Sequence, residues 1–195
     1  DGAGTPPAQA RLPVVHSREI LNVLQRFAEQ SQKLGHLKSQ WAATEFFHER
    51  NAQSDGTIKR DTQHTSSPEQ LVLQGPHFHV ANPRYRTPKE ICNTNRAYDA
   101  IDLAIMPADY LPRTNYVSAC SPDEYRRRIP TWQRPLPGGG TSDEQFNERY
   151  RLANREMAAV TGERTYISSI LPPGPAHIHA VYSQVFADDH MLGLM

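Results

Sequence analysis

The segment from Val80 to Glu90 concentrates side chains that bind anions and flat rings. Three cations stand against one carboxylate over residues 82–90, together with one tyrosine and two prolines. Guanidinium and ammonium groups bind phosphate, and a tyrosine ring stacks on a base or hydrogen-bonds in a groove. The segment therefore predicts a cationic loop that contacts DNA. Its candidate contacts are Arg84, Tyr85, Arg86 and Lys89.

A second cationic stretch runs from residue 113 to residue 134. Five arginines stand there against two carboxylates. Arginine without lysine suits bidentate contacts to phosphate or to guanine. The candidate DNA contacts in this stretch are Arg113, Tyr116, Arg126, Arg127 and Arg128. Arg126–Arg128 also end a predicted helix, where cations interact favourably with the helix dipole, so a purely local role explains the triplet equally well.

Four histidines form two His-X-His pairs, His77 with His79 and His177 with His179. Residues two apart on a strand lie on the same face, so each pair could direct both imidazoles to one side. Two pairs on neighbouring strands could surround a metal ion. This spacing makes a metal-dependent hydrolase the alternative function. No cysteine or carboxylate cluster accompanies the pairs, so surface or hydrogen-bonded histidines are the simpler interpretation.

Other catalytic patterns find no support in the sequence. His48-Glu49 would need a further histidine at position 52 to form a zinc-protease helix, and that residue is Ala52. The glycine run before Thr141 lacks the Gly-Lys-Ser/Thr ending of a phosphate loop, and no Gly-X-Gly-X-X-Gly turn occurs. We therefore expect no catalytic residue in this chain.

Composition predicts one domain that is rich in loops. The 195 residues suffice for a buried core, and 16 of them are prolines. Lysine plus arginine and aspartate plus glutamate number 21 each, which argues against a protein that coats DNA non-specifically but allows a local cationic patch. Two cysteines, no signal peptide and no run of about 18 apolar residues predict a cytoplasmic protein without a membrane segment.

Interspersed strand and helix patterns predict an irregular α+β domain over residues 17–195, after a Pro/Gly/Ala-rich linker at residues 1–16. Helices are expected at Arg18 to about Leu34 with Ser17 as N-cap, at Trp41–Arg50, at Pro122–Arg128 with Ser121 as N-cap, and at Asp143–Val160. Strands are expected at Thr57–Asp61, Leu71–Val80, Ala100–Ile105 and Arg164–Leu171, and His177–Phe186 suits a strand or a helix. The apolar run at residues 191–195 leads us to expect a fragment of a longer protein.

Several blocks of the chain resemble one protein family. They are Phe47–Ile58, Gly75–Pro88, Tyr98–Leu103, Asp109–Tyr116 and Gly162–Gly174. Together they are similar to the region after the catalytic core of large adenine-N6 DNA methyltransferases. Those proteins belong to restriction–modification and phage-defence systems of the type IIG-like, BREX-like and DISARM-like kinds. The resemblance covers residues 41–186, and its last block is the most specific.

The resemblance implies a target-recognition segment that holds double-stranded DNA for the remaining methyltransferase domain of the same protein, which uses S-adenosylmethionine. Asn82-Pro-Arg-Tyr85 is similar to the family's catalytic Asn-Pro-Pro-Tyr loop, but Arg84 replaces the second proline. In the family that loop binds the amino group of a flipped adenine. The family's glycine-rich cofactor loop has no counterpart here, so we expect a chain that binds no cofactor and is not catalytic alone.

Three functions stay open at this point. The first is DNA target recognition by the two cationic stretches. The second is a metal-dependent hydrolase that uses the four paired histidines. The third is a structural domain that binds protein partners, which the apolar helices allow.

Overall fold

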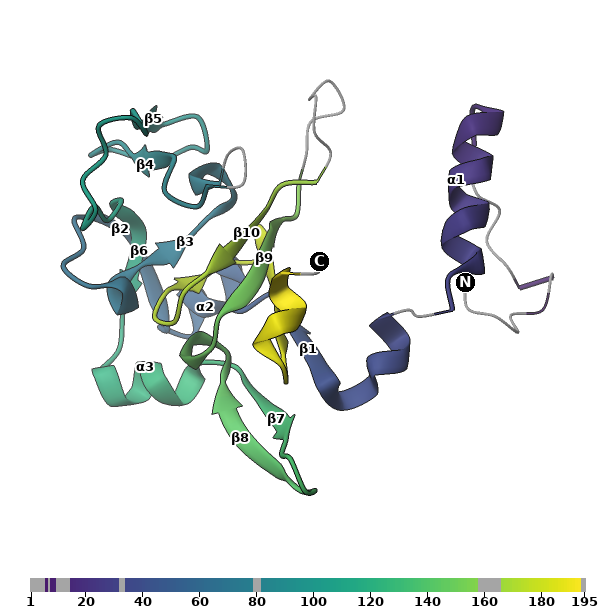
Figure 1. Ribbon diagram of the computed structural model, residues 1–195. Helices are drawn as coiled ribbons and strands as arrows, with labels where there is room; N and C mark the ends of the chain where they lie inside the picture. Colours follow the sequence, from purple (N-terminus) through teal and green to yellow (C-terminus); the bar gives the residue numbers. More distant parts are fainter. Residues whose placement is uncertain are drawn as a thin grey trace. The chain divides into compact units, whose positions relative to one another are not determined.

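The computed structural model describes residues 6, 8–9, 15–31, 34–78, 82–157 and 166–193. The chain divides into two compact units, Asp1–Lys38 and Ser39–Met195. Helices and short strands in several small sheets both occur, which confirms the predicted α+β class (Figure 1). Within the described ranges, no helix has the length and apolar character needed to cross a membrane.

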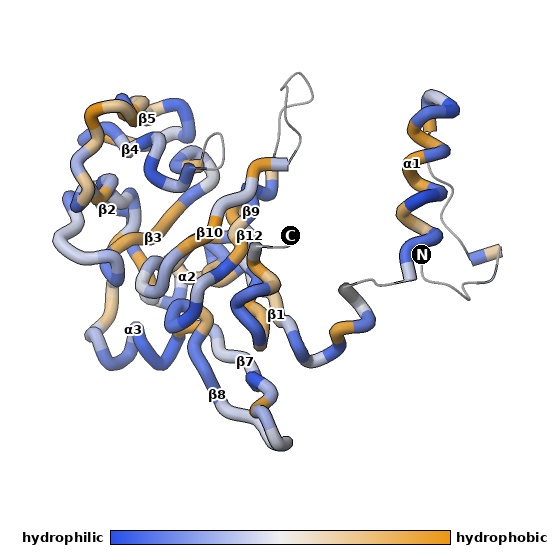
Figure 2. The backbone as a smooth tube through the Cα atoms, in the orientation of Figure 1, coloured by the Kyte–Doolittle hydropathy of each residue, from blue (hydrophilic) through white to orange (hydrophobic). Residues whose placement is uncertain are grey.

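The smaller unit contains one amphipathic helix, α1 (Arg18–Glu29). The Ser17 side chain caps it by accepting a hydrogen bond from the backbone N–H of Ile20 at 3.3 Å, as its sequence predicts. The helix ends earlier than predicted, and the short 3₁₀ helix η1 (Leu34–Gln40) follows. Apolar and polar residues alternate along α1 in Figure 2, and none of its residues is buried.

A four-stranded antiparallel sheet forms the centre of the larger unit. Its strands, in spatial order, are β1 (Trp41–Thr44), β12 (Val181–Phe186), β9 (Arg151–Arg155) and β10 (Ser168–Leu171). The predicted helix over Trp41–Arg50 is therefore wrong in its first half. Trp41 pairs with Phe186 and Thr44 with Ser183, so contacts with a strand 140 residues later override the local helical pattern. For His177–Phe186 the sequence suited a strand or a helix, and the structure has the strand β12 over Val181–Phe186.

The predicted helix over Asp143–Val160 is also wrong. Its residues form the end of a strand, a 3₁₀ turn and the strand β9, and residues 158–160 lie outside the described ranges. Phe146 and Leu152 are both buried, but they belong to two different elements rather than to one helix face. Apolar spacing alone does not separate these two arrangements.

Within the described residues of the larger unit, four two-stranded sheets accompany the central one. They pair β2 (Ile58–Gln63) with β6 (Thr114–Ser118), β3 (Val72–Leu73) with β11 (Ala176–His177), β4 (Arg86–Pro88) with β5 (Tyr98–Ala100), and β7 (Thr131–Pro135) with β8 (Thr141–Gln145). The predicted strand at Ala100–Ile105 is wrong, because only Ala100 belongs to a strand and the Ile105 residue is 79% exposed.

Short helices connect these sheets. They are α2 (Glu49–Ser54), α3 (Pro122–Arg128), η2 (Pro68–Gln70), η3 (Gly75–His77), η4 (Phe146–Glu148) and η5 (Asp189–Gly193). Helix α3 has the predicted bounds and the predicted N-cap, since the Ser121 side chain accepts from the backbone N–H of Glu124 at 3.3 Å. The predicted strand Leu71–Val80 is interrupted by η3, which begins at Gly75, and residues 79 and 80 lie outside the described residues.

The core joins both ends of the larger unit. Phe46 and Phe47 pack with Ile178 and Val185, and a parallel β-bridge links Phe47 to Ile178. A second cluster, with Leu73, Phe78, Ala153, Leu171 and Val181, lies beside the central sheet. Segments 130 residues apart in sequence are thus held together by apolar burial.

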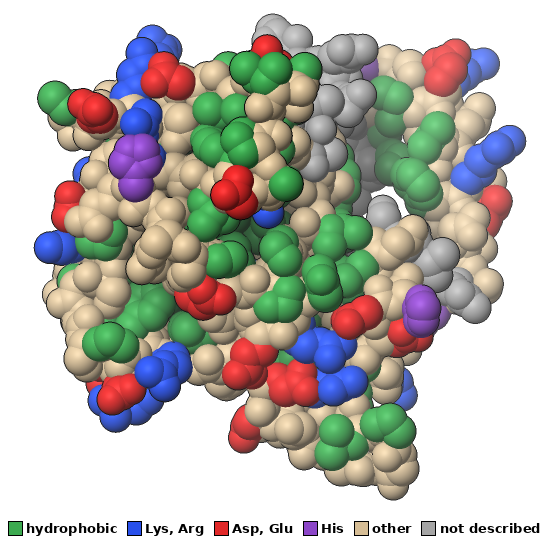
Figure 3. Space-filling model, turned by 60° about the vertical axis from the view of Figure 1, so that its left-hand side comes forward, with side chains coloured by type: hydrophobic (Ala, Val, Ile, Leu, Met, Phe, Trp, Pro, Cys, Tyr) green, Lys and Arg blue, Asp and Glu red, His purple; other side chains and the backbone are tan. Residues whose placement is uncertain are grey.

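A groove with a volume of about 860 Å³ lies between the β2–β6 sheet, α3 and the Pro173–Gly174 turn. Val72 and Ile129 contribute buried apolar walls, while Lys59, Gln63 and Glu148 contribute polar side chains. Hydrophobic side chains gather over the middle of the face that Figure 3 presents, with charged side chains of both signs around them. Charges of both signs give the groove no preference for an anionic or a cationic ligand.

The turn after β10 requires glycine at position 174. Gly174 has φ +111°, and a Cβ atom there would lie 2.9 Å from the Cβ of Pro68. We expect Gly174→Ala to lower the free energy of unfolding by about 2 kcal/mol or more, because backbone strain and a steric clash add. The matched control is Gly139→Ala, where φ is +102° but no atom lies within 4 Å. Urea denaturation should show the larger loss for Gly174→Ala, and equal losses would contradict the clash.

Candidate nucleic-acid interface

The short β4–β5 sheet gathers cations from two parts of the chain. Arg84, Arg86 and Lys89 come from β4 and its flanks. Arg113 joins them because its backbone N–H donates to Thr87 Oγ1 at 2.8 Å and its Nε donates to Pro88 O at 2.7 Å. Four of the predicted DNA contacts, separated by up to 29 residues, thus lie around one strand.

Only two of these four cations form ion pairs within the described residues, and both pair with Asp99. Lys89 Nζ lies 3.6 Å from Asp99 Oδ1, and Arg113 Nη2 lies 3.9 Å from Asp99 Oδ2. Arg84 Nη1 donates to the Tyr110 carbonyl oxygen at 3.1 Å. Because a carbonyl group carries no net charge, the positive charge of Arg84 stays uncompensated. Among the residues that the structure describes, neither Arg84 nor Arg86 forms an ion pair with a carboxylate. Positive charge therefore accumulates around β4.

Tyr85 lies within this group and is half-buried. The guanidinium carbon of Arg86 lies 5.8 Å from the centroid of the Tyr85 ring, which is within the range of a cation–π contact. This contact holds Arg86 against a neutral ring rather than against an anion. The predicted aromatic contact thus occupies the same surface as the cations.

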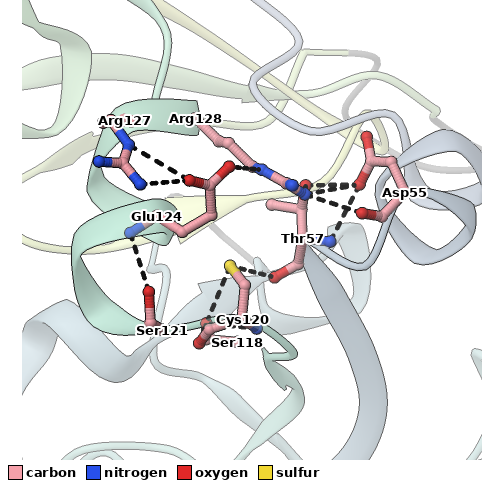
Figure 4. A network of polar contacts seen from close by, with 8 residues as sticks. All are labelled: Asp55, Thr57, Ser118, Cys120, Ser121, Glu124, Arg127 and Arg128. Carbon is pink, nitrogen blue, oxygen red and sulfur yellow. Dashed lines mark hydrogen bonds and ion pairs between the residues drawn. The ribbon is translucent and has the colours of Figure 1, made fainter.

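The arginines of α3 are neutralised locally (Figure 4). Arg127 Nη2 lies 2.5 Å from Glu124 Oε2, and Arg128 Nε lies 2.8 Å from Glu124 Oε1. Arg128 also reaches Asp55 at 3.3 Å and Thr57 Oγ1 at 2.8 Å. Hydrogen bonds from Arg127 and Arg128 hold the pKa of the Glu124 carboxyl below its ordinary value.

The remaining member of the triplet is paired as well, because Arg126 Nη2 lies 3.1 Å from Asp123 Oδ1. Three arginines are thus balanced by three carboxylates, and Arg128 fastens α3 to the turn before β2. In Figure 1, α3 lies below the β4–β5 sheet and apart from it in the larger unit. The structure brings Arg113 of the second predicted stretch to β4 but leaves Arg126, Arg127 and Arg128 in the ion pairs of α3.

Tyr116 cannot stack on a base in this structure, which corrects its predicted role. Its side chain is fully buried, and its hydroxyl bonds to Glu49 and to Arg60 Nη2, the latter at 2.6 Å. Burial raises the pKa of the Tyr116 hydroxyl. Arg60 also lies 2.8 Å from Glu49 Oε1 and donates to the Cys92 carbonyl oxygen at 3.3 Å. Tyr116 therefore supports a polar network that ties α2 to the β4–β5 loop.

His77 is a buried structural residue rather than one of two ligands on a strand face. It lies in η3, and its Nδ1 accepts from the backbone N–H of Gln74 at 3.0 Å. The ring proton is therefore on Nε2, which donates to the Arg113 carbonyl oxygen at 3.0 Å. Its predicted partner His79 lies outside the described residues.

His177 and His179, the second predicted pair, also use ring nitrogens in hydrogen bonds. His177 Nε2 lies 2.7 Å from Ser183 Oγ, and its Nδ1 lies 3.3 Å from the Ile178 carbonyl oxygen. His179 Nδ1 accepts from the backbone N–H of Glu49 at 3.2 Å. No lone pair is left on His77, His177 or His179 to bind a metal ion. In the described part of the chain, no group of three or more His, Cys, Asp or Glu side chains could hold one.

The structure forms one arrangement that sequence spacing does not indicate. The rings of His48 and His179 stack with centroids 4.7 Å apart and an interplanar angle of 11°. His48 is exposed and His179 is half-buried. The sequence drew attention to both residues separately, but only the β-bridge between Phe47 and Ile178 makes them neighbours.

Comparison of the chain with protein-family models, with curated proteins and with solved structures found no match.

The buried histidines predict an acid-sensitive fold. Burial lowers the pKa of His77 to about 4, and burial together with the Arg151 charge lowers that of His177 to about 3. Both lie below the ordinary value of about 6.5, so the unfolded chain binds more protons between these values. We expect the free energy of unfolding to be highest above pH 6.5 and to fall below it, by about 2 kcal/mol per histidine between pH 7 and pH 5.

Urea denaturation over this pH range measures the effect. His77→Gln should weaken the pH dependence of the free energy of unfolding, because glutamine takes up no proton in this pH range. The control His64→Gln changes an exposed histidine and should leave the slope as it is. If the free energy of unfolding depended on pH equally in the wild type and in both variants, His77 would not be a source of the acid sensitivity.

Proposed function

We propose that this chain is a DNA-binding target-recognition segment that contacts the duplex through the surface around β4. The observation that carries the proposal is the charge distribution. Of Arg84, Arg86, Lys89 and Arg113, only Lys89 and Arg113 form ion pairs within the described residues, and both pair with Asp99. Uncompensated cations on one surface attract the phosphate backbone and release its counterions.

The proposed interface consists of Arg84, Tyr85, Arg86, Lys89 and Arg113. It leaves out Tyr116, which is buried, and Arg126, Arg127 and Arg128, which are paired with carboxylates. A protein that reads DNA also needs a rigid support for its contacts. The network of Glu49, Arg60 and Cys92 supports this surface by linking α2 to the loop between β4 and β5.

The similarity of residues 41–186 to adenine-N6 DNA methyltransferases supports the same proposal and adds the context. In that context another domain of the same protein transfers the methyl group from S-adenosylmethionine, within a restriction–modification or phage-defence system. This chain holds and inspects double-stranded DNA and binds no cofactor itself. Free thiols at Cys92 and Cys120 suit the reducing cytoplasm, where such systems act.

A protein-contact role has one specific observation in its favour. Helix α1 exposes Ile20, Leu24 and Phe27, with exposed fractions of 48%, 40% and 66%. An apolar stripe of this kind on a helix suits contact with another protein surface. We propose this as a second role, confined to the smaller unit.

Salt dependence tests the DNA interface. We expect Arg84→Ala/Arg86→Ala to weaken binding of a random-sequence duplex and to reduce the slope of log K against log salt by about 2, because each lost phosphate contact removes about 0.9 from the slope. Fluorescence anisotropy with a labelled duplex between 50 and 200 mM NaCl measures this slope.

The matched control is Arg126→Ala/Arg127→Ala, which removes the same two charges from α3. We expect an unchanged slope for this variant, because both arginines are neutralised within the helix. Equal slopes for the wild type and Arg84→Ala/Arg86→Ala would show that β4 is not the DNA-binding surface. A reduced slope in the α3 variant would place phosphate contacts there instead.

A further inference from the structure

The stacked pair of His48 and His179 is held in place by backbone hydrogen bonds. Phe47 N–H donates to the His177 carbonyl oxygen at 3.2 Å, and His179 N–H donates to the Phe47 carbonyl oxygen at 2.9 Å. These two bonds form the parallel bridge between Phe47 and Ile178. The next residue of each strand is a histidine, so the bridge places the two rings side by side.

Both rings are held in the same tautomer. His179 Nδ1 accepts from the backbone N–H of Glu49 at 3.2 Å, and His48 Nδ1 accepts from that of Asn51 at 3.5 Å. A neutral imidazole whose Nδ1 accepts carries its proton on Nε2. The rings are parallel and both direct Nδ1 toward the first turn of α2, so their Nε2–H groups point away from that turn. The pair therefore presents two N–H donors from stacked rings.

The surroundings leave these donors available to an anion. The neighbouring carboxylate of Glu49 is occupied by Arg60 and by the Tyr116 hydroxyl. Within the described residues, no hydrogen bond engages Nε2 of His48 or of His179. Arg60, which is ion-paired with Glu49, also donates a hydrogen bond to the Cys92 carbonyl oxygen. Cys92 lies in the loop between β4 and β5. Glu49 thus links His179, through Arg60, to the loop that joins β4 to β5.

We propose that His48 and His179 together bind one phosphate group through their two Nε2–H donors. The protons on Nε2 exclude a metal ion at these atoms and favour an acceptor with two oxygens, which a phosphodiester provides. The source of the phosphate is the DNA backbone, so this inference rests on the proposed DNA-binding function. The pair adds a neutral contact to the charged contacts of β4.

Long-range ¹H–¹⁵N spectra of the histidine rings test the site without DNA. Both rings should show the Nε2–H tautomer, and titration with inorganic phosphate should shift the Nε2–H signals of His48 and His179 but not that of the exposed His64. Nδ1–H tautomers, or rings that do not respond to phosphate up to 100 mM, would overturn the proposal.

Duplex binding at pH 8 tests the same pair as a backbone contact. His48→Phe/His179→Phe keeps two stacked rings and removes both donors, and we expect about tenfold weaker binding at constant salt. The salt slope should not change, because neutral imidazoles release no counterions. His48→Gln/His179→Gln supplies an amide N–H near the Nε2 position and should keep affinity within about threefold. His64→Phe serves as the exposed control.

The possible outcomes separate the two proposals. Wild-type affinity in the Phe variant overturns the histidine contact and leaves the β4 interface standing. A reduced salt slope in the Phe variant also overturns it, because the pair would then act as charge. If the wild type binds no duplex, the proposed function fails, and the phosphate titration alone decides whether the pair is an anion site.

Discussion

The bridge between Phe47 and Ile178 is the contact on which the larger unit depends. It joins the segment after β1 to the segment before β12, and Phe46, Phe47 and Ile178 lie in one apolar core cluster. Burial of these side chains stabilises the bridge far more than its two hydrogen bonds do. The bridge places α2 against His179, and α2 in turn places Glu49 within reach of Arg60 and Tyr116.

Ion pairing decides which cations remain able to attract DNA. Counted along the sequence, the two arginine-rich stretches look alike. In the folded chain Glu124 binds two arginines of α3, and Asp55 approaches from a different element to bind one of them again. Around β4 the only carboxylate in ion-pair contact among the described residues is Asp99. The difference between a structural and a functional arginine is therefore the position of the carboxylates, which local charge counts do not contain.

Two histidines and one arginine are buried in the interior, and each forms hydrogen bonds there. His77 and His177 are fully buried, and each ring satisfies both nitrogens with backbone or serine oxygen and nitrogen atoms. Arg151 is buried beside them, where it donates to the Pro175 carbonyl oxygen and lies 5.5 Å from the Phe46 ring centroid. Burial lowers the pKa of Arg151 to about 10. His77 and His177 therefore serve hydrogen bonding within the core.

The sequence by itself determined the features that depend on neighbouring residues. The caps Ser17 and Ser121, the turn glycines and the bounds of α3 follow from local hydrogen bonding and backbone sterics. Only the tertiary structure decided that Trp41–Thr44 is a strand, that residues 143–155 leave the helical state, that Tyr116 is buried and that His48 meets His179. Those outcomes depend on partners that are distant in sequence. Strand pairing and apolar burial with such partners outweigh the fractions of a kcal/mol by which local propensity favours a helix.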